Sequence, residues 1–487
     1  MKPFAIWFIG RRVGVREPAC ALALVLTVIF NVAAVTPAWP MAPPALTPAP
    51  PDSSGLVSGT GSSYWGMIPA PMDSSTAVFD NRGRKAWEWP LAVPYSAINL
   101  VLRGIRVGTA VGVLWVKDWG VWRYVSILPI PQGFTPGVDY SALEGFGLTV
   151  SYQNRLGSPN NPFRLRGYYS MEGWQKYTLG FMFNQNGKTN LQVGFGYRLR
   201  PKLSFCGIGP NSRGDHESFY EDERAWGGAN LRYWIAENTF ISFLGAFSSI
   251  AARDPDTSAD TTTIADIPGG TPPGFEERSD GVMLRFASVY NTAKNLGNPD
   301  RGTILGGTIG GFVSTNSADA EFLAYRLEFQ KFFPLWHHRR VLAVRAYMNW
   351  IDELGDTTVP FQRMFINEMP DQFRGFDESR WRDLGITGIT LEYRFPLMAI
   401  KPNSGFGIDT IFLADIGQVF DDLDQIKRDN LTQSYGFGFR TYITPNFLGT
   451  MEFVWSDEGF QFRLSTRQLF QFSKDVLYQG REETIIH

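Results

Sequence analysis

The chain has 487 residues, of which only 19% are charged, 15% are Phe, Trp or Tyr, and 50 are glycine. Soluble domains carry about 25% charged residues, and a mean hydropathy of −0.14 is too polar for a protein with many apolar helical spans. These features favour a β-barrel in an outer membrane, while a net charge of −2 gives no support for nucleic-acid binding.

The N-terminus has the pattern of a secretory signal peptide over residues 1–38. Four basic residues within the first sixteen precede an apolar run at 19–35, and small residues and proline follow it. An N-terminal membrane anchor is the alternative, because seventeen apolar residues lie near the lower limit for a membrane-spanning helix. Once this leader is removed, Cys206 is the only cysteine, so no internal disulfide and no thiolate metal site is expected.

Two segments separate this leader from the main body of the chain. Residues 39–63 are rich in Pro, Ala, Ser and Gly, which predicts a flexible linker. Residues 64–143 are expected to form a short periplasmic segment. Within it, residues 94–119 have the composition of one apolar helix, on the inner rim or plugging the lumen, and a pair of extra strands is the alternative.

From residue 144 to residue 470 the sequence repeats one rhythm. Stretches in which large apolar side chains alternate with small or polar ones are separated by turn residues, a pattern that predicts β-strands. The expected strands are 144–155, 161–171, 174–184, 189–200, 202–209, 225–237, 238–251, 280–293, 302–315, 319–332, 339–351, 385–396, 405–420, 431–443, 446–456 and 459–470. The prediction is therefore an all-β membrane fold, a sixteen-stranded antiparallel outer-membrane β-barrel, followed by a C-terminal tail at 471–487.

The alternation is clearest at residues 389–395 and 460–467. In both stretches one face carries only large apolar side chains and the other carries polar residues, including arginine. Such a strand fits lipid on its outer side and water on its inner side. A soluble β-sandwich, which buries its apolar face in a core, has the same period, and the secretory leader and the strand lengths favour the barrel.

The predicted strand at 202–209 depends on a tight turn at 200–202 and on the placement of the long connections. With this strand included, the connections 210–224, 252–279, 352–384 and 421–430 all follow odd-numbered strands. If the chain starts in the periplasm, all four lie on the outer side, where such barrels carry their long loops.

The connection 352–384 is long enough to require a functional or structural reason. It contains the run Asp-Gln-Phe-Arg-Gly-Phe-Asp at 371–377. Two further motifs follow it, Leu-Glu-Tyr-Arg-Phe-Pro at 391–396 and Phe-Leu-Ala-Asp-Ile-Gly-Gln-Val-Phe at 412–420.

These three segments, in this order and spacing, resemble the BamA/TamA-like superfamily of outer-membrane assembly barrels, or bacterial surface antigens. The resemblance implies that the long outer loop folds back into the lumen. Its tip, formed by Arg374, Gly375 and Phe376, would latch onto two acidic residues of the wall, Glu392 and Asp415. A guanidinium forms strong, often bidentate bonds with carboxylates, which supports this assignment. In the alternative interpretation Arg374 is an ordinary loop arginine in solvent.

Two other segments agree with the resemblance. Ser-Val-Tyr-Asn at 288–291 is followed by a turn ending in Asp300, Arg301 and Gly302, which is similar to the family's strand–turn signature. Phe-Cys-Gly-Ile-Gly at 205–209 lies where such barrels often carry a Phe-x-Gly-x-Gly segment.

Two features depart from the family pattern. Residues 64–143 show no β-α-α-β-β rhythm, so the chain resembles a branch that lacks the periplasmic POTRA repeats. The terminal strand, with Phe460, Phe462 and Phe470, has the aromatic end that an assembly machinery reads. Seventeen residues follow Phe470, so either it acts as an internal signal or the tail 471–487 lies in the periplasm.

The resemblance implies a non-enzymatic barrel in the outer membrane of a Gram-negative-type bacterium that helps insert proteins or lipids, or exports polypeptides. Its expected partners are the lipid bilayer, unfolded outer-membrane or secreted polypeptides, and the machinery that inserts the barrel itself; no nucleic acid, cofactor or metal is expected. The family also implies a weak seam between strands 144–155 and 459–470. The alternatives are a passive pore or surface adhesin, and a barrel-embedded hydrolase, against which the placement of His337 and His338 in an inner turn argues.

Overall fold

The computed structural model describes residues 132–465, except for gaps at 142–144, 256–261, 265–269, 294–297, 317–319, 336–339, 368–371, 400–405 and 444–445. The predicted leader, the linker, most of the segment 64–143, Phe470 and the tail lie outside the described residues. Among the residues that are described, none belongs to a helix long and apolar enough to cross a membrane.

Sixteen strands form a single antiparallel sheet whose spatial order follows the sequence. They are β1 (Phe134–Ser141), β2 (Gly145–Arg155), β3 (Pro162–Ser170), β4 (Gln175–Phe183), β5 (Thr189–Phe205), β6 (Ser218–Ala236), β7 (Thr239–Arg253), β8 (Arg278–Asn291), β9 (Gly302–Ser314), β10 (Glu321–Pro334), β11 (Val341–Glu353), β14 (Gly385–Ala399), β15 (Phe406–Phe420), β16 (Thr432–Ile443), β17 (Asn446–Ser456) and β18 (Gly459–Ser465). The predicted sixteen-stranded antiparallel architecture is confirmed.

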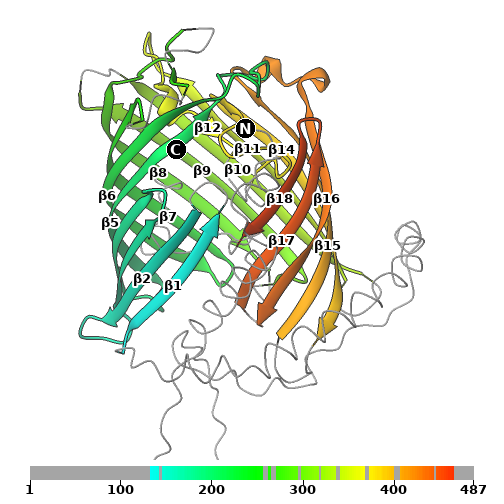
Figure 1. Ribbon diagram of the computed structural model, residues 1–487. Coiled ribbons are helices and arrows are strands. Elements are labelled where there is room, and N and C mark those ends of the chain that lie inside the picture. Colours follow the sequence, from blue (N-terminus) through cyan, green and yellow to red (C-terminus); the bar gives the residue numbers. More distant parts are fainter. Residues whose placement is uncertain are drawn as a thin grey trace, which may run out of the picture.

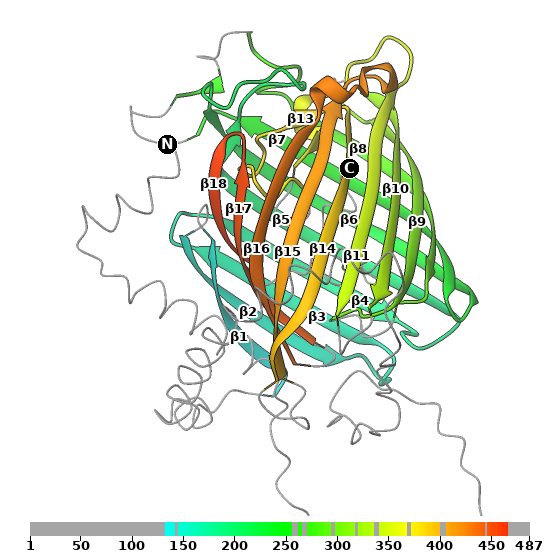
Figure 2. The same cartoon turned by 90° about the vertical axis from the view of Figure 1, so that its right-hand side faces the viewer.

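The sheet curls into a barrel-like wall (Figure 1). Its two ends, β1 and β18, face each other, and no backbone ladder joins them among the described residues. A separate two-stranded ribbon, β12 (Phe365–Ile366) with β13 (Arg382–Asp383), lies within the connection from β11 to β14. Figure 2 shows the wall from the side of β14 to β18. Three short 3-10 helices complete the described fold: η3 (Phe361–Arg363), η4 (Leu423–Gln425) and η5 (Arg428–Asn430).

The predicted fifth strand at 202–209 is wrong. Residues 189–205 form one strand, β5, and the register with β6 shifts between Arg200 and Leu203. Pro201 lies within this shift; because proline has no N–H to donate to the ladder, it is tolerated at a bulge. The sequence signal that suggested a turn therefore marks a β-bulge inside one long strand.

The sheet still has sixteen strands because β1 was not predicted. It lies before residue 144, where the sequence placed the start of the barrel. It pairs with β2 along its length. Its Pro136 and Gly137 obscure the strand pattern, although proline is acceptable in a strand at the end of a sheet. The predicted seam accordingly involves β1 and not residues 144–155.

The long connections still follow odd-numbered strands, because the extra strand β1 replaces the wrongly predicted strand 202–209 in the count. The connections 206–217, 254–277, 354–384 and 421–431 all follow strands at odd positions in the sheet, and they gather at one end of the wall (Figure 1). The connections of two residues at 237–238 and the six at 335–340 follow even-numbered strands.

The two faces of the wall differ in polarity in the way that the alternation predicts. On β14, Ile389 and Leu391 are exposed on the outer face, whereas Glu392 and Arg394 are buried on the inner face. The outer face elsewhere exposes large apolar residues such as Leu284, with 66% of its surface accessible. A single sheet that is apolar outside and charged inside excludes the β-sandwich alternative, since a sandwich buries its apolar faces between two sheets.

Candidate functional site: a loop anchored on the inner wall

The connection between β11 and β14, residues 354–384, supplies many of the buried residues of the molecule. Val359, Phe361 and Phe376 are almost fully buried and belong to one apolar cluster with Tyr220 of β6 and Phe312 of β9. Because Tyr220 and Phe312 lie on the inner face of the sheet, the described part of this loop packs against that face. Its apolar underside gains the usual free energy of burial.

Arg374, at the tip of this loop, contacts both acidic residues named by the family resemblance. Its Nε and Nη2 donate to the two carboxylate oxygens of Asp415, each at 2.8 Å. Its Nη1 donates to Oε1 of Glu392 at 2.6 Å. The side chain of Arg374 is 1% exposed, so the alternative of a solvated loop arginine is wrong. A bidentate bond to one carboxylate and a second bond to another fix the guanidinium in orientation as well as position.

The sequence did not identify a third carboxylate at this site. Glu452 of β17 accepts from Nη1 of Arg374 at 3.4 Å. A signal existed, because Glu452 alternates with the apolar Met451 and Phe453 and therefore belongs to the inner face. We refer to Glu392, Asp415 and Glu452 as the carboxylate cage.

Other arginines of the inner wall share the charge of the cage. Arg394 donates to Oε2 of Glu392 at 2.8 Å, and Arg440 lies 3.7 Å from the same oxygen. On β18, Arg463 stands opposite Glu452 in the register. Glu392 therefore has several cationic partners, whereas within the described residues Asp415 accepts hydrogen bonds from Arg374 alone.

Gly375 and Phe373 explain how the loop tip approaches the wall so closely. A Cβ on Gly375 would lie 2.5 Å from Cβ of Ser434 and 2.9 Å from Cβ of Ser456, so only glycine fits between β16 and β17. Ser456 donates its hydroxyl to the carbonyl of Gly375 at 2.8 Å. Phe373 lies over Gly417 of β15, where a Cβ would come within 2.5 Å of its ring.

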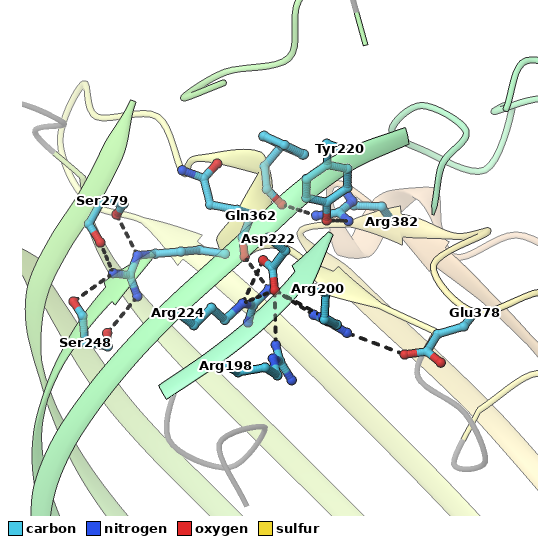
Figure 3. A network of polar contacts seen from close by, with 12 residues as sticks. Arg198, Arg200, Tyr220, Asp222, Arg224, Ser248, Ser279, Gln362, Glu378 and Arg382 are labelled. Atoms are coloured by element: carbon cyan, nitrogen blue, oxygen red, sulfur yellow. Dashed lines mark hydrogen bonds and ion pairs between the residues drawn. The ribbon is translucent and has the colours of Figure 1, made fainter. Parts of the chain in front are cut away.

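The same loop is held on the opposite side of the interior by a second polar network (Figure 3), which the sequence did not reveal. Asp222 of β6 is fully buried and lies 2.9 to 3.4 Å from three arginines, Arg198, Arg200 and Arg224. Arg224 also donates to the carbonyl of Gln362 in the loop at 3.3 Å. We refer to Asp222 with its three arginines as the arginine knot.

Two loop arginines extend from this side into the wall. Arg363 donates to the hydroxyl groups of Ser248 at 3.1 Å and Ser279 at 2.7 Å. Arg382 donates to the hydroxyl of Tyr220 and the carbonyl of Phe361, each at 2.6 Å. Burial lowers the pKa of Arg363 to about 9, yet the group stays protonated at neutral pH. The loop is therefore bonded to both β6–β8 and β14–β17.

Two acidic residues outside the strands of the wall, Glu458 and Asp383, differ in whether a cation neutralises them. Glu458, in the turn between β17 and β18, accepts from Nε of Arg380 at 2.7 Å. Asp383 is 1% exposed and accepts from the backbone N–H of Leu384 at 2.9 Å, while no donor among the described residues reaches its second carboxylate oxygen. Burial, with a contribution from the charge of Asp421, raises the pKa of Asp383 to about 7.

The predicted turn signature lies apart from the carboxylate cage. Asp300 accepts from Arg301 at 3.5 Å. Gly302 has a φ of +109°, and a Cβ there would lie 2.5 Å from the carbonyl oxygen of Thr292, so the turn requires glycine. The turn still touches the inner wall, because Arg394 donates to the carbonyl of Pro299 at 3.3 Å.

The remaining predicted residues occupy different places. Phe460 of β18 is 37% exposed and its ring lies 5.1 Å from that of Trp455, while Phe462 lies 5.3 Å from Phe453. Phe205 is buried against Phe361 of the loop at 5.4 Å. Cys206 is a buried free thiol. The two histidines that a hydrolase would use, at 337 and 338, lie outside the described residues.

Comparison with known proteins gives one family. The model of the Omp85 superfamily domain matches residues 154–468. A search of curated proteins found no match.

Solved structures with a similar fold include two kinds of protein. A BamA from Haemophilus ducreyi lacking POTRA domains 1–3 is 15% identical, with a TM-score of 0.48 over 67% of this chain and 68% of that chain. CdiB from Acinetobacter baumannii is 14% identical, with a TM-score of 0.42 over 66% of this chain and 55% of that chain. CdiB from Escherichia coli is 10% identical, with a TM-score of 0.44 over 68% and 60%.

Proposed function

The chain belongs to the Omp85 superfamily, and from this premise we propose that it is a non-enzymatic barrel that assembles or translocates polypeptides or lipids in the outer membrane of a Gram-negative-type bacterium. In this proposal the barrel-like wall spans the bilayer, with β1 and β18 facing each other at a seam. Support comes from the polarity of the wall, because the outward residues are apolar and the inward ones charged, as a lipid-facing barrel requires.

The working part of this proposal is the inward-folded loop. Arg374 in the carboxylate cage latches the loop tip to β14, β15 and β17, and so holds the loop inside the lumen. The observation that supports this part of the proposal is the set of hydrogen bonds from Arg374 to Asp415, Glu392 and Glu452, on three strands near the β18 end of the sheet. A latch at this place controls how firmly the last strands are held.

The seam between β1 and β18 is the place where a client strand or a lipid would leave the lumen. Both strands are short in the described part of the chain, with eight residues in β1 and seven in β18. A strand without a partner on one side presents free N–H and C=O groups that can pair with another chain. Client polypeptides in an extended conformation fit that requirement.

Depletion of the protein, followed by quantitative proteomics of the outer membrane, tests the proposal. We expect the abundance of other outer-membrane barrels or surface proteins to fall, and wild-type protein to restore it. The matched control is Arg213→Ala, because Arg213 is an exposed arginine whose side chain is 66% accessible; it should restore function, whereas Arg374→Ala should not. An unchanged outer-membrane proteome would contradict the proposal and favour a passive pore or adhesin.

A further inference from the structure

The charges on the inner wall are distributed unevenly around the barrel. On β14 to β18, acidic residues (Glu392, Asp409, Asp415 and Glu452) and arginines (Arg394, Arg440 and Arg463) are buried together. On β3 to β11 the inward positions carry many basic residues but only three carboxylates, Asp222, Glu328 and Glu353; the basic residues are Arg164, Arg166, Lys176, Arg198, Arg200, Arg224, Arg232, Arg285, Arg326 and Arg345. This second half of the wall therefore has a net positive charge.

Arg285 of β8 is a buried arginine of the inner wall with an unsatisfied guanidinium nitrogen. Its side chain belongs to a residue only 8% exposed, and its Nη1 has no hydrogen-bond partner. Its cross-strand neighbours are Leu244 of β7 and Gly310 of β9. Within the described residues no carboxylate bonds to it, and a buried cation without a counter-ion is costly.

A second arginine lies close to Arg285 on the next strand but one. Gly310 stands opposite Ala324 of β10, so Arg326 is the adjacent inward residue on that strand. Two strands are separated by roughly 10 Å, a span that two long arginine side chains can bridge. The charge of Arg326 acts unfavourably on that of Arg285. Arg326 also lies 5.3 Å from the ring of Phe365, in the loop.

The strand between the two arginines carries only small residues at this height. A Cβ on Gly310 would lie 3.4 Å from both Cβ and Cγ of Arg285, so the stem of Arg285 lies over Gly310. Next to it on the inner face is Thr308, which stands opposite Arg326. Thr308 thus places a hydroxyl-bearing residue on β9, directly opposite Arg326 and diagonal to Arg285 in the register.

We propose that Arg285 and Arg326, with the hydroxyl of Thr308, form a binding site for a phosphate group, either free phosphate or the phosphate of a lipid headgroup. A phosphate group carries up to two negative charges and would supply the counter-charge that no described carboxylate gives to Arg285. Guanidinium groups also bind phosphate oxygens in pairs. The site lies below the loop and does not depend on the assembly role.

Isothermal titration calorimetry tests the site on the full chain in an uncharged detergent. Inorganic phosphate is titrated at constant ionic strength, with chloride as the balancing anion. We expect saturable binding that Arg285→Gln weakens at least tenfold. The matched control is Arg463→Gln, a buried inner-wall arginine opposite Glu452, which should change the affinity less than twofold. Absence of saturable binding, or equal losses in both variants, would overturn the proposal.

Further variants keep the test decisive if Arg285→Gln does not fold, as judged by heat-modifiable gel mobility. Arg285→Lys retains the charge but loses the two-pronged donor, and Thr308→Val retains every charge but removes the hydroxyl of the proposed site. Each should weaken phosphate binding at least threefold, and unchanged affinity in both would refute the site. Short-chain phosphatidic acid added as a competitor identifies the source: displacement of phosphate indicates a lipid headgroup, and no displacement indicates free phosphate.

Discussion

Replacing Arg374 with alanine removes the cation that the carboxylate cage surrounds. Glu392 keeps Arg394 at 2.8 Å, whereas Asp415 loses both of its bonds from the guanidinium. The main cost therefore falls on Asp415, which is left as a buried charge without its partner. Breaking a buried pair in this way destabilises a protein by about 3–5 kcal/mol, and we expect a loss of that order in the free energy of unfolding.

The size of the effect can be separated into parts by a double-mutant cycle. Asp415→Asn in the Arg374→Ala background removes the uncompensated charge, so the double variant should recover roughly 1–3 kcal/mol of the loss. Arg374→Lys keeps the charge but cannot form the bidentate bond, and it should fall between wild type and alanine.

The measurement is unfolding by urea in detergent, followed by heat-modifiable gel mobility and by tryptophan fluorescence. Arg213→Ala serves as the control, because exposed ion pairs contribute only about 0–1 kcal/mol. If Arg374→Ala costs no more than this control, the guanidinium does not hold the loop, and the reasoning from burial and geometry is refuted.

Two further predictions follow from the same loop. Gly375→Ala places a Cβ 2.5 Å from that of Ser434 and should cost about 1–3 kcal/mol by overpacking in the same urea assay. The control is Gly167→Ala, where the atom nearest to a Cβ is Cδ1 of Tyr177 at 3.6 Å and where, as at Gly375, φ is not positive. It should cost less, and equal costs would exclude the close approach as the cause. The pKa of Asp383 is raised to about 7 from about 3.9 in an unfolded chain, so the neutral carboxyl stabilises the fold below pH 4 and this stabilisation is lost as the pH rises through 7. Between pH 5 and pH 8 the free energy of unfolding should fall by about 2–3 kcal/mol, which is measured as a lower thermal unfolding midpoint. Asp383→Asn should remove that part of the pH dependence. An identical pH profile in the variant would contradict the assignment.

Much of the wall could be predicted from the sequence because side chains in a strand alternate between two faces. The pattern at residues 389–395 placed Ile389 and Leu391 outside and Glu392 inside, as the structure has them. Asp415 was harder, since both Phe412 and Leu413 are apolar. The structure explains this difficulty: Leu413 is on the inner face and packs with Ile411 and Val454 in a small apolar cluster.

The sequence by itself determined the all-β antiparallel class, the polarity of the two faces and, through the family resemblance, the contact of Arg374 with Glu392 and Asp415. The predicted number of strands was right only because one strand too many, 202–209, offset the missed β1. Only the tertiary structure decided that residues 189–205 are one strand, that β1 begins the sheet, and that Glu452 completes the cage. It alone showed the arginine knot around Asp222, and that no carboxylate in the described part of the chain bonds to Arg285. The reason is physical: alternation sets the face on which a side chain lies, but which side chains meet depends on the register between strands and on the curvature that brings distant strands together.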